Sequence, residues 1–481
     1  MKKTKVLLPL ALLFTSMLIG GCASFGKSDL HHIEKTTHPK TGLSLTQSNK
    51  TEDAEIQKAV QSMLEGELTL DSALRIGLMN NPMLQGVYQE LGIAKADLLQ
   101  ATLFHNPRFE GHARSPNDGG NTNVEIVFAQ DIMSVLLMPV RRRVAAAEFE
   151  EVKLRTSDAV ISLIAEIKTA FYELLAREQV KALRKSISEA SGASVELSER
   201  LFAAGNINTV ELGTQKSIHE QAVIDLMHSE YDAKIAREPI NRLLGLHGEL
   251  TNTWQVTHVL PELSESDPEL HSLEELALKE RFDYAAVRQE IEVMRRSLLA
   301  TRLGIVPEGE VGFNTEREPD GNRVTGPTWS FPTPIFDWRQ AASSRAKSEL
   351  RLSEFKASAF QVEVLSQVRH AREKMIAYRK VAERYRDQTI PIRKQLVEDL
   401  QLHYNYMLKG VFELLQSKKD AIDAEREYIE TLKNYWIARA ELERSVGGKL
   451  PGSEINESKE IPSVLPTETK QKMDHHGGHQ Q

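Results

Sequence analysis

The chain has a single cysteine among its 481 residues, together with only 18 prolines, 27 glycines and 6% aromatic residues. One cysteine excludes a disulfide framework and any zinc or iron–sulfur site that is built from cysteines. The shortage of chain-breaking and aromatic residues argues against a β-sandwich or a multidomain α/β enzyme and favours long helices. The net charge of −8 excludes a generally basic nucleic-acid-binding protein, because little positive charge is left to neutralise phosphates.

The signatures of common enzyme classes are missing too. The sequence contains no G-x-S-x-G nucleophile motif, no phosphate-binding P-loop and no H-E-x-x-H zinc motif. Acid–histidine pairs such as His219-Glu220 fall in segments predicted to be exposed helix faces. We therefore predict that the protein is not an enzyme, and we assign it no catalytic residues and no cofactor.

The N-terminus has the features of a secretory signal peptide over residues 1–21. A lysine-rich start is followed by an apolar run over 6–19, and its about 14 residues fall short of the ~20 that span a bilayer. Residues 18–22, which read Leu-Ile-Gly-Gly-Cys, resemble the lipobox of bacterial lipoproteins. This resemblance implies acylation of Cys22, and Ala23 after it implies sorting to the outer membrane. The alternative is an incidental cysteine at the end of an ordinary signal peptide.

The body of the chain is internally duplicated. Shifted by 200 residues, the stretch that ends at Pro107 matches the one that ends at Pro307 without a gap. Shifted by 202 residues, Gly245 matches Gly447. Polar, glycine and proline positions agree as well as leucines, which argues against chance similarity between leucine-rich helices. We predict a lipid-anchored flexible segment, two repeats, a linker between them and a disordered tail. The anchored segment covers 22–65, the repeats cover 66–250 and 268–450, the linker covers 251–267, and the tail covers 451–481.

Each repeat predicts the same order of elements. An amphipathic helix ends at the matched proline, which cannot continue a helix. Two short alternating segments around a turn then predict a β-hairpin with strands of about ten residues. A very long helix follows, with apolar residues spaced 3.5 apart as in coiled coils, and a return helix closes the repeat. Pro239 should bend the first return helix and Pro391 should kink the second long helix. The ranges are about 70–104 and 272–304 for the opening helices, 107–132 and 307–335 for the hairpins, and 140–204 and 340–405 for the long helices.

These elements cannot be sealed within one copy. A helix of about 65 residues reaches roughly 97 Å, too far for a compact domain. Four strands cannot close a barrel, and open strand edges are not tolerated in lipid. Three chains would supply twelve strands, and four chains sixteen. The predicted fold class is mainly α with a β-barrel part, in which duplicated halves of coiled-coil helices and hairpins assemble into a conduit.

An ordered set of motifs over about 66–448 resembles the TolC family of outer-membrane efflux channels. The motifs are Leu70-x2-Ala73-Leu74 with Asn80-Asn81-Pro82, Arg281-Phe282-Asp283-Tyr284, Pro334-Ile335-Phe336-Asp337, and Ala204-Gly205 with Val210-Glu211-Leu212. Phe282 stands where the family usually has proline. The resemblance implies a homotrimer with a 12-stranded outer-membrane barrel on a periplasmic α-helical barrel. It also implies a passive conduit that works with a periplasmic adaptor protein and an inner-membrane pump of the RND type.

The resemblance also assigns residues at the periplasmic end. The adaptor-docking tips would be the turns Ala204-Gly205-Asn206 and Leu408-Lys409-Gly410. Glu413 matches the first of two acidic positions that ring the family's closed mouth, and Gln416 replaces the second. Losing one carboxylate ring would halve the fixed charge that attracts cations. The alternative is that Glu413 is a solvated carboxylate or one paired between helices.

The C-terminal tail suggests a cargo class. It carries Met473, His475, His476 and His479. Neutral imidazoles suit copper, zinc, nickel and cobalt, and methionine suits Cu(I). The tail is therefore a candidate metal-binding segment, and it favours heavy-metal ions (copper and silver, or zinc, cobalt and cadmium) over drugs as cargo. The alternative is a solvated tail that binds nothing.

A second class of function stays open at this point. A lipid-anchored periplasmic coiled-coil adaptor or scaffold would also carry helical hairpins and an anchor. Such a protein does not need two β-hairpins at the far end of duplicated halves. Trimers with single-channel conductance would therefore separate the two classes.

Overall fold

The computed structural model describes residues 28–46, 53–115, 117, 119, 121–256, 259–263, 269–304 and 309–450. Cys22, Pro307 and the tail with Met473, His475, His476 and His479 lie outside these ranges. The chain divides into two compact units. The first unit draws its described residues from Met1–Asp53, Pro82–Ile161 and Phe282–Val362. The second draws them from Ala54–Asn81, Ser162–Arg281 and Glu363–Gln481.

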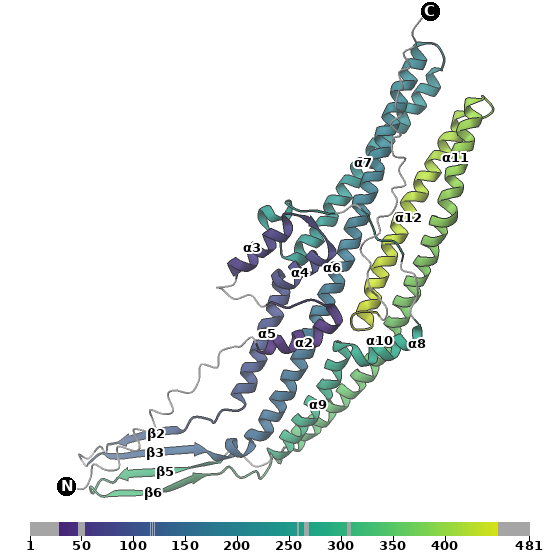
Figure 1. The fold of residues 1–481 in the computed structure, drawn as a ribbon. Coiled ribbons are helices and arrows are strands. Elements are labelled where there is room, and N and C mark those ends of the chain that lie inside the picture. Colours follow the sequence, from purple (N-terminus) through teal and green to yellow (C-terminus); the bar gives the residue numbers. More distant parts are fainter. Residues whose placement is uncertain are drawn as a thin grey trace, which may run out of the picture. The chain divides into compact units, whose positions relative to one another are not determined.

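The first unit contains a four-stranded antiparallel sheet in the order β2-β3-β5-β6 (Figure 1). Its strands are β2 (Arg108–Arg114), β3 (Asn123–Asp131), β5 (Glu310–Arg317) and β6 (Arg323–Ser330). They lie within the segments expected to form hairpins, but they have 7, 9, 8 and 8 residues, fewer than the ten expected. The two hairpins join through β3 and β5 into one sheet, a non-local pairing that no sequence pattern indicated.

Among the described residues of the first unit, three helices are complete: α2 (Ser28–Thr41), α5 (Pro82–Gln100) and α9 (Phe282–Leu303). The Lys40 ammonium lies 4.1 Å from the ring centroid of Phe282. The Gln85 amide donates a hydrogen bond to the Thr46 carbonyl at 3.1 Å. Ile33 on α2 is fully buried. The described part of the segment over 22–65, for which a flexible chain was expected, therefore supplies apolar residues that make buried contacts.

The two long helical segments differ from each other. The helix α6 runs unbroken from Ile132 to Ala203, 72 residues. In the second repeat, α10 (Gln340–Arg384) is followed by a π-helical turn, η3 (Tyr385–Thr389), and then by α11 (Ile390–Asn405). Pro391 has no N–H for an i→i−4 hydrogen bond, and a π turn is one way to re-route the helical ladder before a proline. The irregularity expected at Pro391 is thus a π turn that precedes it.

The second unit holds the return helices α7 (Thr209–Leu244) and α12 (Val411–Ser445). It also holds α3 (Asp53–Leu64), α4 (Leu70–Asn80) and α8 (Leu270–Glu280). Two short strands, β1 (Glu67–Leu68) and β4 (Gln255–Val256), pair in parallel, and a 3-10 turn, η2, spans Gly248–Thr251. In the core, the rings of Tyr172 and Trp436 lie 5.3 Å apart.

The sequence predicted that each opening helix is continuous, but the structure shows that both are broken. The first breaks between α4 and α5 at Asn81-Pro82, and the second between α8 and α9 at Arg281-Phe282. Asn81 and Arg281 both adopt extended backbone conformations, so neither continues the helix before it. The helical spacing of apolar residues continues across each break, so this spacing does not reveal the break. Pro82 did indicate a helix boundary in the first repeat.

Each break receives the end of a return helix. The buried Asn81 amide donates to the Leu243 carbonyl at 2.8 Å. In the second repeat, the Arg281 guanidinium donates to the Ser445 carbonyl at 3.2 Å and to Gln367 at 2.8 Å. These donors satisfy carbonyls that have no partner within their own helix. Gly447, with φ of 87°, passes so close to Glu280 that a Cβ would lie 2.7 Å from the Glu280 carbonyl oxygen.

Removing the guanidinium at the second break should destabilise the helical unit. Arg281→Ala is expected to cost about 1.5–3 kcal/mol, the usual loss for a buried hydrogen bond from a charged donor. Thermal melting followed by circular dichroism should show the loss. Arg351→Ala, at an exposed arginine on α10, is the matched control and should melt like the wild type. Equal melting of both variants would mean that the joint contributes nothing measurable.

Candidate functional site

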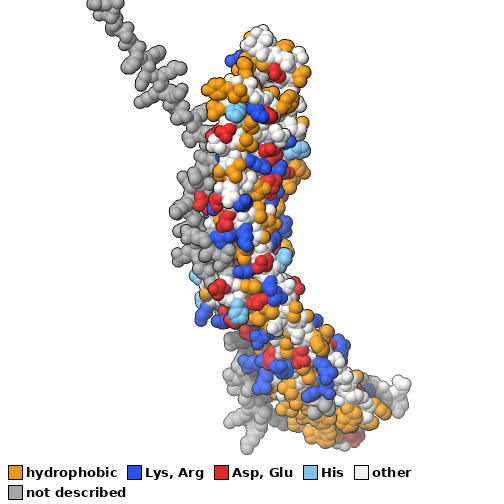
Figure 2. Space-filling view, turned by 90° about the vertical axis from the view of Figure 1, so that its right-hand side faces the viewer, with side chains coloured by type: hydrophobic (Ala, Val, Ile, Leu, Met, Phe, Trp, Pro, Cys, Tyr) orange, Lys and Arg blue, Asp and Glu red, His pale blue; other side chains and the backbone are white. Residues whose placement is uncertain are grey.

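One face of the sheet is apolar and exposed. The register places Phe109, Phe128, Phe313 and Pro327 in one row across all four strands. On the same face, Val311 lies opposite Trp329. The exposed fractions of Phe109, Phe313 and Trp329 are 73%, 65% and 68%. Figure 2 shows hydrophobic side chains gathered at the lower end of the view, where Figure 1 places the sheet. We call this surface the apolar face; such a surface is typical of a contact with lipid or with another chain.

The opposite face is polar and charged, and we call it the polar face. It carries the side chains of Arg108, Glu110, His112, Arg114, Asn123, Glu125, Asp131, Glu310, Asn314 and Glu316. Arg108 pairs with Glu310 at 2.8 Å, and the Asn123 amide donates to Glu316 at 2.6 Å. The Asn314 amide donates to Glu125 at 2.9 Å. Apolar and polar residues therefore alternate along each strand, as in membrane barrels.

Exposed aromatic residues follow the end of β6 along the chain. Phe331, Phe336 and Trp338 are 52%, 91% and 60% exposed. Phe336 belongs to the Pro334-Ile335-Phe336-Asp337 motif. Tryptophan and other aromatic side chains gather where a membrane meets water. The end of the sheet that leads into the helices therefore has the composition of a membrane–water boundary.

The sheet has two open edges. Within the described strands, β2 and β6 are each hydrogen-bonded on one side only. Unpaired strand groups are costly in an apolar environment, and an apolar exposed face makes such an environment the natural one here. Each sheet therefore leaves the outer edges of β2 and β6 without a partner among the described strands.

The first tip turn is built by local capping. α6 ends at Ala203, and Gly205 adopts φ of 74°, which is natural only for glycine. The Asn206 N–H donates to the Leu201 carbonyl at 2.9 Å. α7 then begins with a reciprocal cap: the Glu211 N–H donates to the Asn208 side chain at 2.9 Å, and the Asn208 N–H donates to the Glu211 carboxylate at 3.1 Å. Ala204, Gly205 and Asn206 are all exposed.

The second tip turn has the same path but a strained residue. Met407 takes the place of glycine with φ of 56°, at a cost of roughly 1–2 kcal/mol. The Leu408 N–H donates to the His403 carbonyl at 2.9 Å. Tyr406, Met407, Leu408 and Phe412 are 74%, 94%, 69% and 65% exposed. An exposed apolar turn held in a strained conformation is a common property of binding sites. The sequence placed Met407 in this turn, but it gave no indication that Tyr406 belongs to the exposed apolar surface.

The candidate mouth residues of α12 are engaged by side chains four residues away in the chain, Glu413 by Lys409 of the preceding turn and Gln416 by Asp420 of the same helix. The Lys409 ammonium pairs with Glu413 at 3.0 Å, and both side chains are about half exposed, 46% and 50%. The Gln416 amide donates to Asp420 at 2.8 Å. Both pairs are four residues apart, a spacing that brings side chains together on a helix and that the sequence already displayed. The sequence analysis did not select Asp420, a carboxylate that lies one helical turn beyond Gln416.

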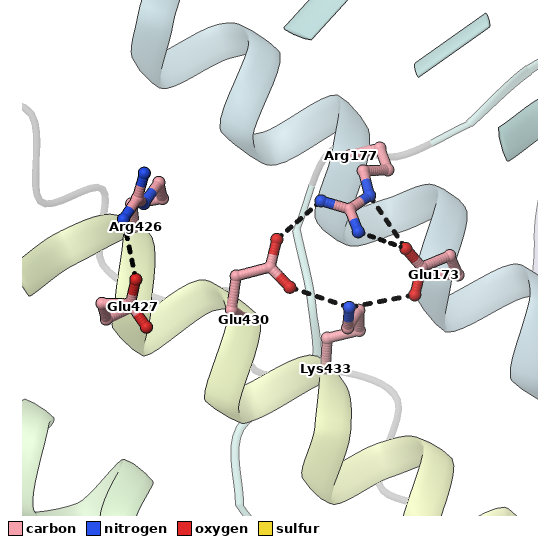
Figure 3. Close-up of polar contacts among 6 residues, drawn as sticks. All are labelled: Glu173, Arg177, Arg426, Glu427, Glu430 and Lys433. Carbon is pink, nitrogen blue, oxygen red and sulfur yellow. Dashed lines mark hydrogen bonds and ion pairs between the residues drawn. The ribbon is translucent and has the colours of Figure 1, made fainter. Parts of the chain in front are cut away.

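A partly buried charge cluster joins α6 to α12 (Figure 3). Lys433 is only 6% exposed, and its ammonium contacts Glu173 at 3.0 Å and Glu430 at 2.8 Å. Arg177 completes the cluster, at 2.7 Å from Glu430 and 2.7 Å from Glu173. Burial by itself would raise the pKa of Glu173, but hydrogen bonds and charges from Lys433 and Arg177 lower it below its ordinary value. Because each charge is matched across the interface, the cluster fixes the register of the two helices.

Acid should weaken this cluster. The folded-state pKa of Glu173 lies below the ordinary 4.5, so its carboxylate stabilises the fold above about pH 4.5, and that stabilisation is lost as the pH falls through the lowered pKa. Melting temperatures of the wild type should therefore fall below pH 4.5 more steeply than those of Glu173→Gln. Glu427→Gln, which removes the partner of Arg426 outside the cluster, is the control and should keep the wild-type slope. Identical slopes for the wild type and Glu173→Gln would contradict the assignment.

None of the helices in the described ranges combines the length and the apolar character needed to cross a membrane. In the same part of the chain, no three histidine, cysteine, aspartate or glutamate side chains come together in a way that could hold a metal ion.

No family model matches the sequence. The cobalt-zinc-cadmium resistance protein CzcC of Cupriavidus metallidurans is 21% identical over 397 residues, which cover 79% of this chain and 90% of CzcC. The outer membrane channel CmeC of Campylobacter jejuni matches 79% of this chain and 85% of its own, with a TM-score of 0.68 at 13% identity. The outer membrane protein VceC of Vibrio cholerae matches 79% of this chain and 96% of its own, with a TM-score of 0.66 at 14% identity. The chain has the fold of the TolC family of outer-membrane channels.

The TolC fold confirms the resemblance drawn from the motifs and the fold class of long helices with a smaller β part. It also places the motif residues. Asn81 and Arg281 lie at the breaks that receive the return helices, and Gly205 lies at the first tip turn. Phe282, which stands in place of the family's proline, begins α9.

Proposed function

We propose that this protein is the outer-membrane channel of a tripartite efflux system. It acts as a passive conduit from the periplasm and an inner-membrane pump to the exterior. The observation that carries this proposal is the sheet with one exposed apolar face, one charged face and two open edges. A lipid-anchored adaptor or scaffold would have no use for such a sheet.

Assembly of three copies closes the sheet. Three four-stranded sheets joined edge to edge give a 12-stranded barrel, within the range of known outer-membrane barrels. The apolar face then meets lipid and the polar face lines the lumen. The helical units of three copies surround the periplasmic part of the conduit. Acylated Cys22 anchors each copy to the outer membrane, and two or more acyl chains suffice for stable anchoring.

The partners are a periplasmic adaptor protein and an inner-membrane pump of the RND type. The two tip turns, at Ala204-Gly205-Asn206 and Leu408-Lys409-Gly410, dock the adaptor. The exposed apolar cluster of Tyr406, Met407, Leu408 and Phe412 supports this role. Glu413 and Asp420 supply the acidic character of the mouth, which Lys409 partly neutralises.

The cargo class is heavy-metal ions. The name of the relative CzcC, a cobalt-zinc-cadmium resistance protein, supports this choice over drugs. The polar face supports it too: its carboxylates (Glu110, Glu125, Asp131, Glu310 and Glu316) outnumber its arginines (Arg108 and Arg114). An acidic lining raises the local concentration of cations. The tail residues Met473, His475, His476 and His479 would add a loose chelating segment.

Cells lacking this chain provide the test. They should accumulate zinc, cobalt or cadmium and grow poorly in these metals, and the full-length chain should restore tolerance. A chain without residues 471–481 measures the contribution of the tail. Loss of dye or drug tolerance with unchanged metal tolerance would overturn the cargo class. No change in tolerance to either would overturn the efflux function.

A further inference from the structure

Two arginines face each other on the apolar face of the sheet. Arg317 ends β5 and lies directly opposite Arg323, which begins β6. The register places both on the face that carries Phe313 and Trp329, at the hairpin-turn end of the sheet. Both are exposed. We call these two residues the arginine pair.

The arginine pair has no counter-charge within the described residues. Like charges directly opposite each other weaken a strand pair, so a partner is expected. Neither arginine forms an ion pair with Glu316, Glu318 or Asp320, the neighbouring carboxylates of the described chain. Glu316 accepts its hydrogen bond from Asn123 on the polar face at 2.6 Å. Asp320 accepts from the Asn322 N–H at 2.9 Å and from its amide at 2.7 Å.

The arginine pair sits at the boundary of the apolar face. Along β6, Arg323 and Trp329 are about 20 Å apart, since a strand rises ~3.4 Å per residue. Between them, Thr315 and Thr325 are hydrogen-bonded to each other at 3.0 Å, and Phe313 lies opposite Pro327. The order from the turn is therefore basic, hydroxyl, apolar and aromatic. This order matches a membrane that is crossed from headgroups at the turn end, through hydrocarbon, to the aromatic boundary at the helix end.

We propose that the arginine pair binds the phosphate of an anionic lipid in the leaflet at the hairpin-turn end of the sheet. The proposal rests on the proposed function, which places the apolar face in lipid. Guanidinium groups hold phosphate through two parallel N–H donors each, and the phosphate removes the repulsion between them. The acyl chains of the same lipid pack along the apolar face beside Phe313. A trimer carries three such sites.

The test measures lipid bound to the full-length trimer in detergent by native mass spectrometry. The probes are bisphosphorylated lipid A and, for comparison, phosphatidylcholine. The double variant R317Q/R323Q should bind lipid A at least tenfold more weakly than the wild type. R114Q is the matched control, because Arg114 lies at the same end of β2 but on the polar face, and it should bind lipid A as the wild type does. Phosphatidylcholine binding should be the same in all three proteins.

Equal binding of lipid A by the wild type and R317Q/R323Q would overturn the proposal, and so would an equal loss in R114Q. Displacement of lipid A by inorganic phosphate alone at the same concentration would show that a free anion, not a lipid, is the ligand. Conductance of the same samples separates this inference from the channel function. A double variant that conducts but has lost lipid A supports the site. If the wild type conducts but binds no lipid A, the lipid site is wrong and the channel function stands. If the wild type neither inserts nor conducts, both the lipid site and the channel function are wrong.

Discussion

Gly312→Val is expected to prevent assembly of the channel. A Cβ at this position would lie 1.9 Å from the Phe128 carbonyl oxygen and 2.8 Å from the Ala129 Cα, both on the neighbouring strand β3. Because the obstacle is backbone, it cannot rotate away, and the cost should exceed the ~1–3 kcal/mol of ordinary overpacking. The pairing of β3 with β5 joins the two hairpins into one sheet. Without it, the chain would have two separate hairpins and could not supply four adjacent strands to a barrel.

The same sheet offers a control for this substitution. Gly326 on β6 has nothing within 4 Å of the position of a Cβ, so Gly326→Val should assemble normally. Valine favours strands, which removes propensity as an explanation for any difference. Trimer content in detergent and its thermal resistance are the measurements. Trimers of Gly312→Val as abundant and heat-resistant as those of Gly326→Val would contradict the observed pairing of the hairpins.

Charging the second tip turn is expected to abolish efflux while leaving the channel intact. Met407 and Leu408 are 94% and 69% exposed, so aspartate at both positions costs little folding energy but removes the apolar surface offered to the adaptor. If both side chains are central contacts worth at least ~2 kcal/mol each, adaptor binding should weaken by on the order of 1,000-fold. Metal accumulation in cells and adaptor binding to the purified protein are the measurements.

Met83→Asp is the control for this experiment, because Met83 is 77% exposed on α5 and lies outside the tip turns. It should retain adaptor binding and efflux. Trimer content and conductance of M407D/L408D should match the wild type. Retained efflux in M407D/L408D would dismiss the second turn as the docking site, whereas lost trimers would point to a structural role for the turn.

The sequence predicted those parts of the fold that depend on local pattern. The apolar spacing of the long helices and the glycine of the first tip turn are local signals, and Gly205 lies where it was expected. The strand alternation around Phe313 separated an apolar from a polar face before any pairing was known. The second tip turn was also placed correctly, but the left-handed conformation of Met407 was not foreseen, because methionine gives no local signal for it.

The parts that escaped prediction are those set by distant contacts. The breaks at Asn81 and Arg281 depend on the ends of return helices about 160 residues away in sequence (|i−j| of 162 and 164), which the local helical pattern does not contain. The joining of β3 to β5 is equally non-local. The charge cluster around Lys433 could not be told from an exposed charged face, since its partner Glu173 lies in the other repeat. The sequence analysis named both Glu413 and Lys409, but it did not predict that they pair, although they are four residues apart.

We propose that this chain, whose sheet has two open edges on its own, forms a conduit by joining two further copies. The most direct measurement combines the mass of the purified full-length protein in detergent with its single-channel current in a planar lipid bilayer. We expect a mass of three chains and discrete ionic currents of uniform size. A protein that stays monomeric and carries no current under the same conditions would contradict the account.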